Sequence, residues 1–176
     1  MWDKILTIFF CILLLQATVK AQTFDIEKSG DILSVALPVS AFLFAIRQEE
    51  HKPIFQFTKT MGVSLMATHS LKIIINKERP NGGDYSFPSG HTSATFTGAA
   101  FIERKYGLKY GIPSYLLASY VGWSRIQANK HDTWDVLGGA VIGIGSAYLF
   151  TKPFKNTKVA LSYFEKYPVL NLTIRL

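Results

Sequence analysis

The sequence predicts an all-α protein, a compact bundle of five to six helices with a short C-terminal extension. Apolar residues recur at helical spacing from about residue 32 to residue 150, and Pro- and Gly-containing turns separate the runs. Only residues 157–176 alternate apolar and polar positions, as strands do. The 176 residues contain no internal repeat and suffice for one domain.

The first 21 residues resemble a secretory signal peptide. Lys4 gives a basic start, Ile5–Leu15 is apolar, and Val19–Ala21 places small residues at the spacing of a cleavage site. An uncleaved transmembrane helix is the alternative, although the apolar run is shorter than the roughly 20 residues of a span. We therefore divide the chain into a leader or first span (1–21), a helical bundle (22–156) and a tail (157–176).

The single cysteine, Cys11, lies in the leader. A mature exported chain would then have neither a disulfide nor a thiol, which excludes cysteine-based phosphatase chemistry and cysteine-ligated zinc. The net charge is +7, but no long Lys/Arg run occurs and aromatic residues are not interleaved with basic ones. We expect no nucleic-acid partner, and an anionic substrate or membrane surface instead.

The first half of the bundle predicts two helices after an acidic stretch, Asp25–Asp31. The apolar run Ile32–Ile46 reads as a helix interrupted by Pro38, and a polar turn follows. Ile54–Asn76 shows clear helical spacing and is followed by a loop that begins at Pro80.

The second half predicts a helix from just after His91 to about Tyr106 and a turn over 107–113. Apolar residues 114–123 and the Gly- and Ala-rich run Thr133–Phe150 complete the bundle. The tail from Thr157 is more like a strand pair or an amphipathic edge than another helix.

The sequence leaves open whether the bundle lies in a membrane or in water. Its apolar runs are shorter than a typical span. Its basic residues nevertheless gather on one set of turns, which would face the cytoplasm and place the polar motifs outside. These residues are Arg47, Lys52, Arg104, Lys105, Lys109, Lys152, Lys155 and Lys158.

The first polar motif contains Lys72 and Arg79, seven positions apart. This spacing would place both cations on one helical face, close to the break at Pro80. An arginine can hold a phosphate with its planar fork, while a lysine acts as a point charge. A solvated basic face has the same pattern, so this motif alone does not distinguish a phosphate site from an ordinary charged surface.

The second motif, Pro88-Ser89-Gly90-His91, predicts a turn into a helix N-terminus. Gly90 permits close approach of the backbone, and the amides of Gly90 and His91 would face an anion together with the positive end of the helix dipole. Ser89 could donate its hydroxyl. An ordinary helix cap with an exposed histidine is the alternative.

The third motif contains His131 and Asp135, four positions apart and so neighbours on a helical face. A carboxylate that accepts the proton of one ring nitrogen leaves the other nitrogen able to attack. Arg125 would reach the same site if the chain breaks near 128–130. A structural His–Asp pair on the surface is the alternative.

Together, Lys-x6-Arg-Pro, Pro-Ser-Gly-His and Ser-Arg-x5-His-x3-Asp resemble the signature of the type-2 phosphatidic acid phosphatase superfamily, with no departure over residues 72–135. That group includes bacterial lipid phosphatases, non-specific acid phosphatases and vanadium haloperoxidases. The resemblance implies that His131 is a nucleophile forming phosphohistidine, Asp135 its partner and His91 the acid for the leaving oxygen. It implies phosphoryl binding by Lys72, Arg79, Ser89, Gly90 and Arg125.

We expect a metal-independent phosphatase without cofactor, because cations and backbone amides can neutralise the phosphoryl charge. Phosphatidate, isoprenyl diphosphate and the phosphates of lipid A are the candidate substrates, with a bilayer or its surface as partner. We expect export to the periplasm or to the inner membrane with a periplasmic site. Alternatives are a soluble non-specific acid phosphatase, a vanadium haloperoxidase, which the small size disfavours, and a non-catalytic phosphate- or lipid-binding module, which the His131–Asp135 pair disfavours.

Overall fold

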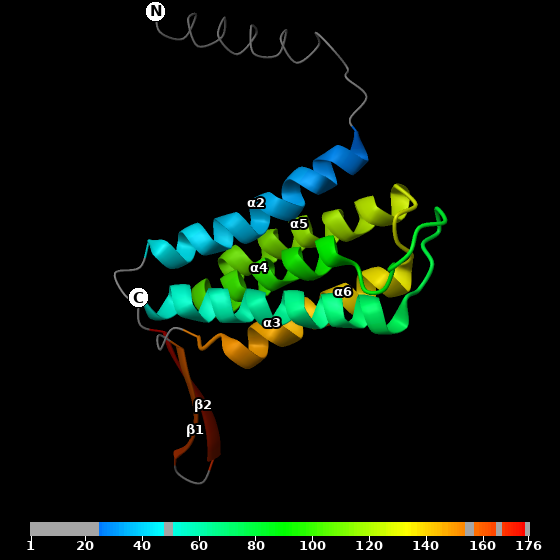
Figure 1. The fold of residues 1–176 in the computed structure, drawn as a ribbon. Helices are drawn as coiled ribbons and strands as arrows, with labels where there is room; N and C mark the ends of the chain where they lie inside the picture. The colour runs from blue at the N-terminus through cyan, green and yellow to red at the C-terminus, as the bar shows by residue number, and fades with distance from the viewer. Residues whose placement is uncertain (1–24, 48–50, 154–156, 165–166, 175–176) are drawn as a thin grey trace, which may run out of the picture.

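The computed structural model describes residues 25–47, 51–153, 157–164 and 167–174 (Figure 1). The predicted leader lies outside the described residues. The described chain forms five helices and one antiparallel strand pair, which confirms the all-α bundle and its strand-like extension. The elements are α2 (Ile26–Ile46), α3 (Lys52–Ile75), α4 (Gly90–Tyr106), α5 (Leu108–Gln127), α6 (Thr133–Phe150), β1 (Thr157–Phe164) and β2 (Tyr167–Ile174).

Helix α4 is the centre of the bundle, since it packs against each of the other four helices. Its face toward α2, α3 and α5 carries the apolar core. Phe101 packs edge-on against Phe57 of α3, with ring centroids 5.0 Å apart. Leu37 of α2 and Ala118 of α5 form a second cluster with Ala99 of α4.

Glycines allow α6 to approach α4 closely. A Cβ atom on Gly143 would lie 2.5 Å from the carbonyl oxygen of Ser93, and one on Gly139 would lie 2.6 Å from that of Ser89. Side chains cannot occupy such distances, so the two backbones pack with nothing between them. Small residues that let helices approach in this way are common in membrane bundles.

Two prolines lie inside helices, although Pro38 was expected to interrupt its helix and Pro113 to lie in a turn, so both expectations were wrong. Helix α2 begins at Ile26, capped by the Asp25 carboxylate on the Lys28 amide at 3.1 Å, and continues through Pro38. Helix α5 begins at Leu108 and contains Pro113 in its second turn. Gly107, with φ 83°, is the single residue between α4 and α5. Each proline lacks an N–H and so removes one backbone hydrogen bond from its helix, and packing of the flanking turns on α4 offsets the loss.

A row of buried hydroxyls joins α3 to α4 and α6. Thr68 donates to Ser93 at 2.9 Å, and Thr97 donates to Ser64 at 2.8 Å. Thr60 forms the third pair with Thr151 at 3.1 Å, and all six side chains are buried. Because every hydroxyl has a partner, this polar row does not carry the penalty of unpaired groups in a core.

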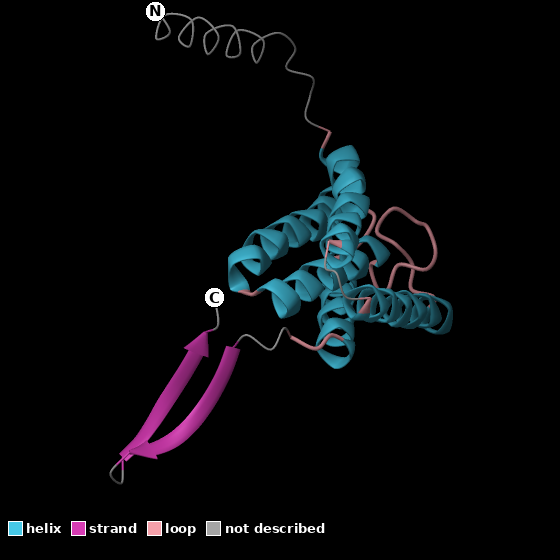
Figure 2. Ribbon diagram, turned by 90° about the vertical axis from the view of Figure 1, so that its left-hand side faces the viewer, coloured by secondary structure: helices cyan, strands magenta, loops and turns pink. Residues whose placement is uncertain are grey.

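Strands β1 and β2 pair antiparallel, from Thr157 opposite Ile174 to Phe164 opposite Tyr167. Figure 2 shows the pair beside the bundle, and the described strand residues contact each other but none of the helices.

The outer surface of the bundle is apolar. Helices α2 and α6 are long and apolar enough to cross a membrane, and only 28% of each apolar window is buried inside the protein. A core helix of a soluble protein would be mostly buried. Large side chains on α6 point outward, with Val141 70% and Leu149 78% exposed. A bilayer would cover such a surface.

We expect Gly143→Ala to destabilise the bundle by about 1–3 kcal/mol, because its methyl group would collide with the backbone of α4. Gly145→Ala is the matched control. It lies on the same helix with no atom within 4 Å of the added carbon, so helix propensity predicts an unchanged or slightly raised stability. Thermal unfolding in detergent, followed by circular dichroism, measures both. Equal melting temperatures would contradict the close α4–α6 packing.

Candidate active site

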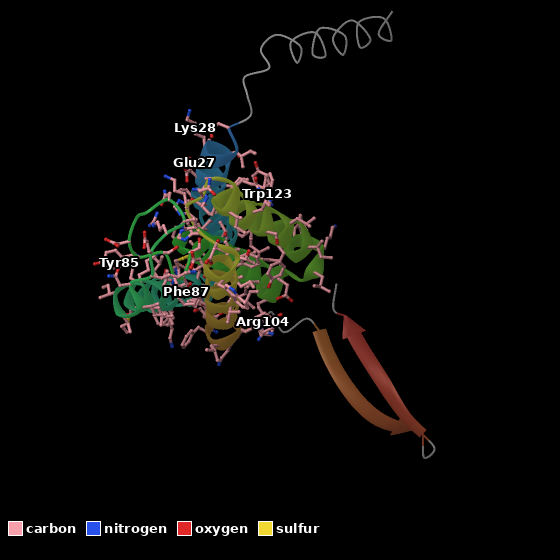
Figure 3. All side chains as sticks on the ribbon, turned by 90° about the vertical axis from the view of Figure 1, so that its right-hand side faces the viewer. Glu27, Lys28, Tyr85, Phe87, Arg104 and Trp123 are labelled. Atoms are coloured by element: carbon pink, nitrogen blue, oxygen red, sulfur yellow. The ribbon has the colours of Figure 1, made fainter. Side chains whose placement is uncertain are left out.

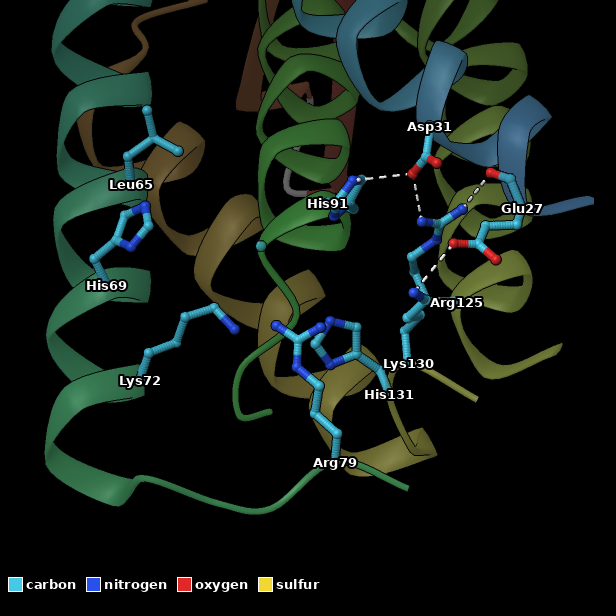
Figure 4. A pocket seen from close by; sticks show the side chains of 11 residues that line it. Glu27, Asp31, Leu65, His69, Lys72, Arg79, His91, Arg125, Lys130 and His131 are labelled. Atoms are coloured by element: carbon cyan, nitrogen blue, oxygen red, sulfur yellow. Dashed lines mark hydrogen bonds and ion pairs between the residues drawn. The ribbon is translucent and has the colours of Figure 1, made fainter. Parts of the chain in front are cut away.

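Five helix ends meet at one end of the bundle and surround a pocket of about 480 Å³. Figure 3 looks at this end, with Glu27 on α2 and with Tyr85 and Phe87 on the loop between α3 and α4. Most of the lining residues have charged or histidine side chains (Figure 4): Glu27, Asp31, His69, Lys72, Arg79, His91, Arg125, Lys130 and His131.

Lys72 and Arg79 both line the pocket, but not from one helical face as expected. Helix α3 ends at Ile75, because Asn76 adopts a left-handed conformation with φ 40°. Arg79 lies in the following loop, where its amide donates to the Gly83 carbonyl at 2.6 Å. Lys72 donates to the Tyr85 carbonyl at 2.6 Å, so the helix and the loop hold the two cations on neighbouring walls.

The N-terminus of α4 enters the pocket at Gly90 and His91. Ser89 is the cap of this helix, and its buried hydroxyl accepts from the Thr92 hydroxyl at 2.9 Å and from the Thr92 amide at 3.4 Å. A Cβ atom on Gly90 would lie 3.8 Å from Cε of Lys72. The positive end of α4 therefore adjoins the lysine, and together they favour an anion.

His131 and Asp135 are brought together, although they do not share a helical face. His131 precedes α6, whose cap is Asp132 in an extended conformation. The Nδ1 atom of His131 lies 3.4 Å from Oδ2 of Asp135, and the two side chains are 4% and 0% exposed. The expected break before His131 is confirmed: Asn129 has φ 53°, and the amides of Lys130 and His131 donate to the Arg125 carbonyl.

Asp135 is held by two residues that were not predicted from the sequence to contact it. Lys77 donates to Asp135 at 2.8 Å and to Asp132 at 2.5 Å. Ser86 donates to the second oxygen of Asp135 through a very short hydrogen bond. Lys77 adjoins the first motif and could have been suspected, whereas nothing in the sequence distinguishes Ser86 from other loop serines.

Arg125 is 3% exposed and turns toward α2. Its Nη1 atom donates to Asp31 at 2.5 Å, and Nη2 donates to the Glu27 carbonyl at 2.6 Å. Asp31 also lies 3.2 Å from Nε2 of His91, and the carboxylate of Glu27 pairs with Lys130 at 3.3 Å. Spacing of four places Glu27 and Asp31 on one face of α2, but the sequence does not show that this face meets α5.

The surroundings of His131 keep its ring neutral. Burial, followed by the positive charges of Lys72 and Arg79, lowers the pKa of His131 to about 4, although Asp135 acts in the opposite direction. For Lys77, the hydrogen bonds to Asp132 and Asp135 outweigh burial and raise the pKa. At neutral pH, then, a neutral imidazole lies beside the positive charges of Lys72 and Arg79, although burial, followed by the charge of Arg79, lowers the pKa of Lys72 to about 8.

The described residues contain no group of three His, Cys, Asp or Glu side chains that could hold a metal ion. The pocket is instead lined by the cations Lys72, Arg79, Arg125 and Lys130. These side chains and the α4 N-terminus can balance the charge of a phosphoryl group.

Fold and site together define a class of protein: a helical bundle that gathers cations and a His–Asp pair at its helix ends. The sequence profile of the PAP2 superfamily matches residues 81–158, which include His91, Arg125, His131 and Asp135. The chain belongs to the PAP2 superfamily, as its three motifs predict.

Several similar proteins are named lipid A 1-phosphatases. The chain is 31% identical to that of Helicobacter pylori over 133 residues, which are 70% of this chain and 66% of the relative. It is 38% identical to that of Porphyromonas gingivalis over 90 residues, which are 48% of this chain and 20% of the relative. The crystal structure of Aquifex aeolicus LpxE matches with a TM-score of 0.63 at 24% identity, covering 74% of this chain and 87% of that chain. This last likeness shows the fold.

We expect His131 to titrate near pH 4, far below the ordinary value of about 6.5 for histidine. Arg79→Gln should raise this pKa, because it removes a positive charge that disfavours the imidazolium, and Asp135→Asn should lower it further. Side-chain NMR of histidine-labelled protein measures these values, with His131→Gln to assign the signal. Lys109→Gln, at the opposite end of the bundle, is the control. A wild-type value near 6.5 that Arg79→Gln leaves unchanged would contradict the described electrostatics.

Proposed function

We propose that this protein is a metal-independent phosphatase that removes a phosphate group from a lipid through a phosphohistidine on His131. The observation that carries the proposal is a buried imidazole that contacts a carboxylate and faces a pocket lined by cations. A binding module needs the cations but not an oriented imidazole. Family membership and the names of the relatives support the same reaction.

In the first step, Asp135 accepts the Nδ1 proton of His131 in a hydrogen bond, so that Nε2 carries the lone pair. Nε2 attacks phosphorus, and the N–P bond forms as the bond to the leaving oxygen breaks. Lys72, Arg79, Arg125 and the amides at Gly90 and His91 balance the charge on the other phosphoryl oxygens. His91 gives its proton to the leaving oxygen.

In the second step, neutral His91 removes a proton from water, and the water oxygen attacks phosphorus. The N–P bond breaks, inorganic phosphate leaves, and His131 returns to its neutral form. Ser89 differs from the expectation in one respect: its hydroxyl caps α4, and we assign it the task of fixing the amides of Gly90 and His91 in the pocket.

A phosphorylated lipid is the substrate class, with a phosphate of lipid A as the first candidate. The names of the relatives support this choice, and so does the apolar exterior of the bundle, which runs up to the end that holds the pocket. Exposed Ile73 and Ile74 on α3 and Trp134 on α6 lie close in sequence to Lys72 and Asp135. An acyl chain can follow such a surface while its phosphate enters the pocket.

The protein is membrane-associated, as its apolar outer helices indicate, and we propose that its site faces the periplasm. All five helices place their other ends opposite the pocket (Figure 1). Those ends carry Arg47, Lys52, Arg104, Lys109 and Lys152. Positive residues favour the cytoplasmic side, so this charge distribution supports a site on the outer side.

We expect His131→Ala to abolish phosphate release and Asp135→Asn to reduce it on the order of 10²- to 10⁴-fold. The assay measures phosphate released from lipid A, phosphatidate and undecaprenyl diphosphate in detergent, with and without EDTA. Phosphohistidine trapped by a denaturing alkaline quench, which preserves the N–P bond, should be absent in His131→Ala. Activity of His131→Ala within tenfold of the wild type would overturn the assignment of the nucleophile, and activity that disappears with EDTA and returns with Mg²⁺ would overturn the metal-free mechanism.

Orthovanadate should inhibit the enzyme, because it adopts the five-coordinate geometry of the phosphoryl transition state. Arg79→Ala should weaken vanadate binding and kcat/KM together, each on the order of 10- to 100-fold, since a charged hydrogen bond is lost in both. Lys109→Ala, at the far end of the bundle, should change neither. Equal vanadate affinity in Arg79→Ala and the wild type would remove Arg79 from the phosphate site.

A further inference from the structure

One carboxylate connects three helices at the rim of the pocket. Oδ1 of Asp31, on α2, lies 3.2 Å from Nε2 of His91 on α4 and 2.5 Å from Nη1 of Arg125 on α5 (Figure 4). Asp31 belongs to none of the three sequence motifs, and the PAP2 profile match begins after it. Its contacts nevertheless join the acid and one of the cations of the proposed reaction.

Several contacts fix α2 in this place. A Cβ atom on Gly30 would lie 2.0 Å from Oγ of Ser124 and 2.5 Å from Nη2 of Arg125, so glycine is what lets α2 lie against the end of α5. The hydroxyl of Ser29 bonds to that of Tyr120 at 2.7 Å. The position of Asp31 therefore follows from backbone packing, and not from the freedom of a long side chain.

The charges around His91 give Asp31 a chemical task. Burial, followed by the positive charge of Arg125 from α5, lowers the pKa of His91, and Arg79 and Lys72 act in the same direction. Asp31 is the neighbouring charge that opposes this shift and favours the imidazolium. A neutral His91 could not donate a proton to a leaving oxygen. An adjacent carboxylate stabilises the imidazolium and fixes the orientation of the ring.

We propose that Asp31 is a positioning residue that orients His91 and stabilises its protonated form as the acid for the leaving oxygen. The inference rests on the proposed phosphatase function and deepens it. Because Asp31 engages Nε2, the proton that His91 delivers comes from Nδ1. As the bond from phosphorus to the leaving oxygen breaks, that oxygen takes the Nδ1 proton, and His91 becomes neutral with its Nε2–H still donated to Asp31.

The experiment compares two leaving groups with kcat/KM, which reports events up to cleavage of the first bond to phosphorus. The alkoxide released from a short-chain phosphatidate requires protonation, whereas p-nitrophenolate is a stabilised anion and does not. We expect Asp31→Asn to lower kcat/KM for the phosphatidate on the order of 10²-fold, with little change for p-nitrophenyl phosphate. His91→Ala should show the same selectivity, and adding Asp31→Asn to it should cost nothing further.

Glu27→Gln is the matched control. Glu27 lies one turn earlier on α2 and lines the same pocket, but its carboxylate pairs with Lys130 and not with His91. This variant should show no dependence on the leaving group. Asp31→Glu, which keeps the charge, should recover part of the phosphatidate activity. The side chain of Asp31 is 47% exposed, so we expect these variants to fold, and Asp31→Ser provides a second neutral variant if Asp31→Asn does not.

Equal losses on both substrates would overturn the inference, because Asp31 would then serve only to hold Arg125. A gain in the activity of Asp31→Asn, with tighter inhibition by inorganic phosphate, would also overturn it. The Asp31 carboxylate would then compete with phosphate for the cations of the site. A wild-type protein that hydrolyses neither substrate would instead overturn the proposed function, and the inference with it.

Discussion

The whole site depends on the burial of one carboxylate. Asp135 is fully buried at the first turn of α6, where an unpaired charge would cost several kcal/mol. Its oxygens are met by Lys77, Ser86 and the Asp132 amide, while His131 lies at 3.4 Å. Its carbonyl accepts from the Ser89 amide at 2.9 Å. A single residue thus ties both loops of the pocket and the start of α4 to α6.

The bundle brings these partners together through small residues. Gly139 lies one turn after Asp135, and the close approach of its backbone to Ser89 is what allows the Ser89 amide to reach the Asp135 carbonyl. A larger residue at that position would separate the N-termini of α4 and α6. The close packing of α6 on α4 at Gly139 and Gly143 therefore also positions the start of α4, whose residues bind phosphate in the proposed reaction.

Much of this architecture could be predicted from the sequence, because local signals and tertiary packing agree. Helix α6 has the predicted bounds, since its cap and its apolar run both begin at the same place. The expected placement of Arg79 on the same helical face as Lys72 was wrong, because α3 ends at Ile75, where Asn76 adopts a left-handed conformation, and Arg79 lies in the loop beyond it. The sequence missed Ser86 and Asp31 because their importance arises from contacts 49 and 94 residues away along the chain.

The hydroxyl row between α3 and its neighbours has a consequence for the pocket. Thr60, Ser64 and Thr68 recur every four residues along α3, and the next position in this series is Lys72. The three interhelical hydroxyl pairs therefore fix the position of α3 along its axis and its rotation about that axis, and with them the position of Lys72 in the pocket. A slip of α3 by one residue would turn Lys72 by about 100° about the helix axis and away from the pocket. The electrostatic field at one end of the bundle is thus fixed by uncharged groups along its length.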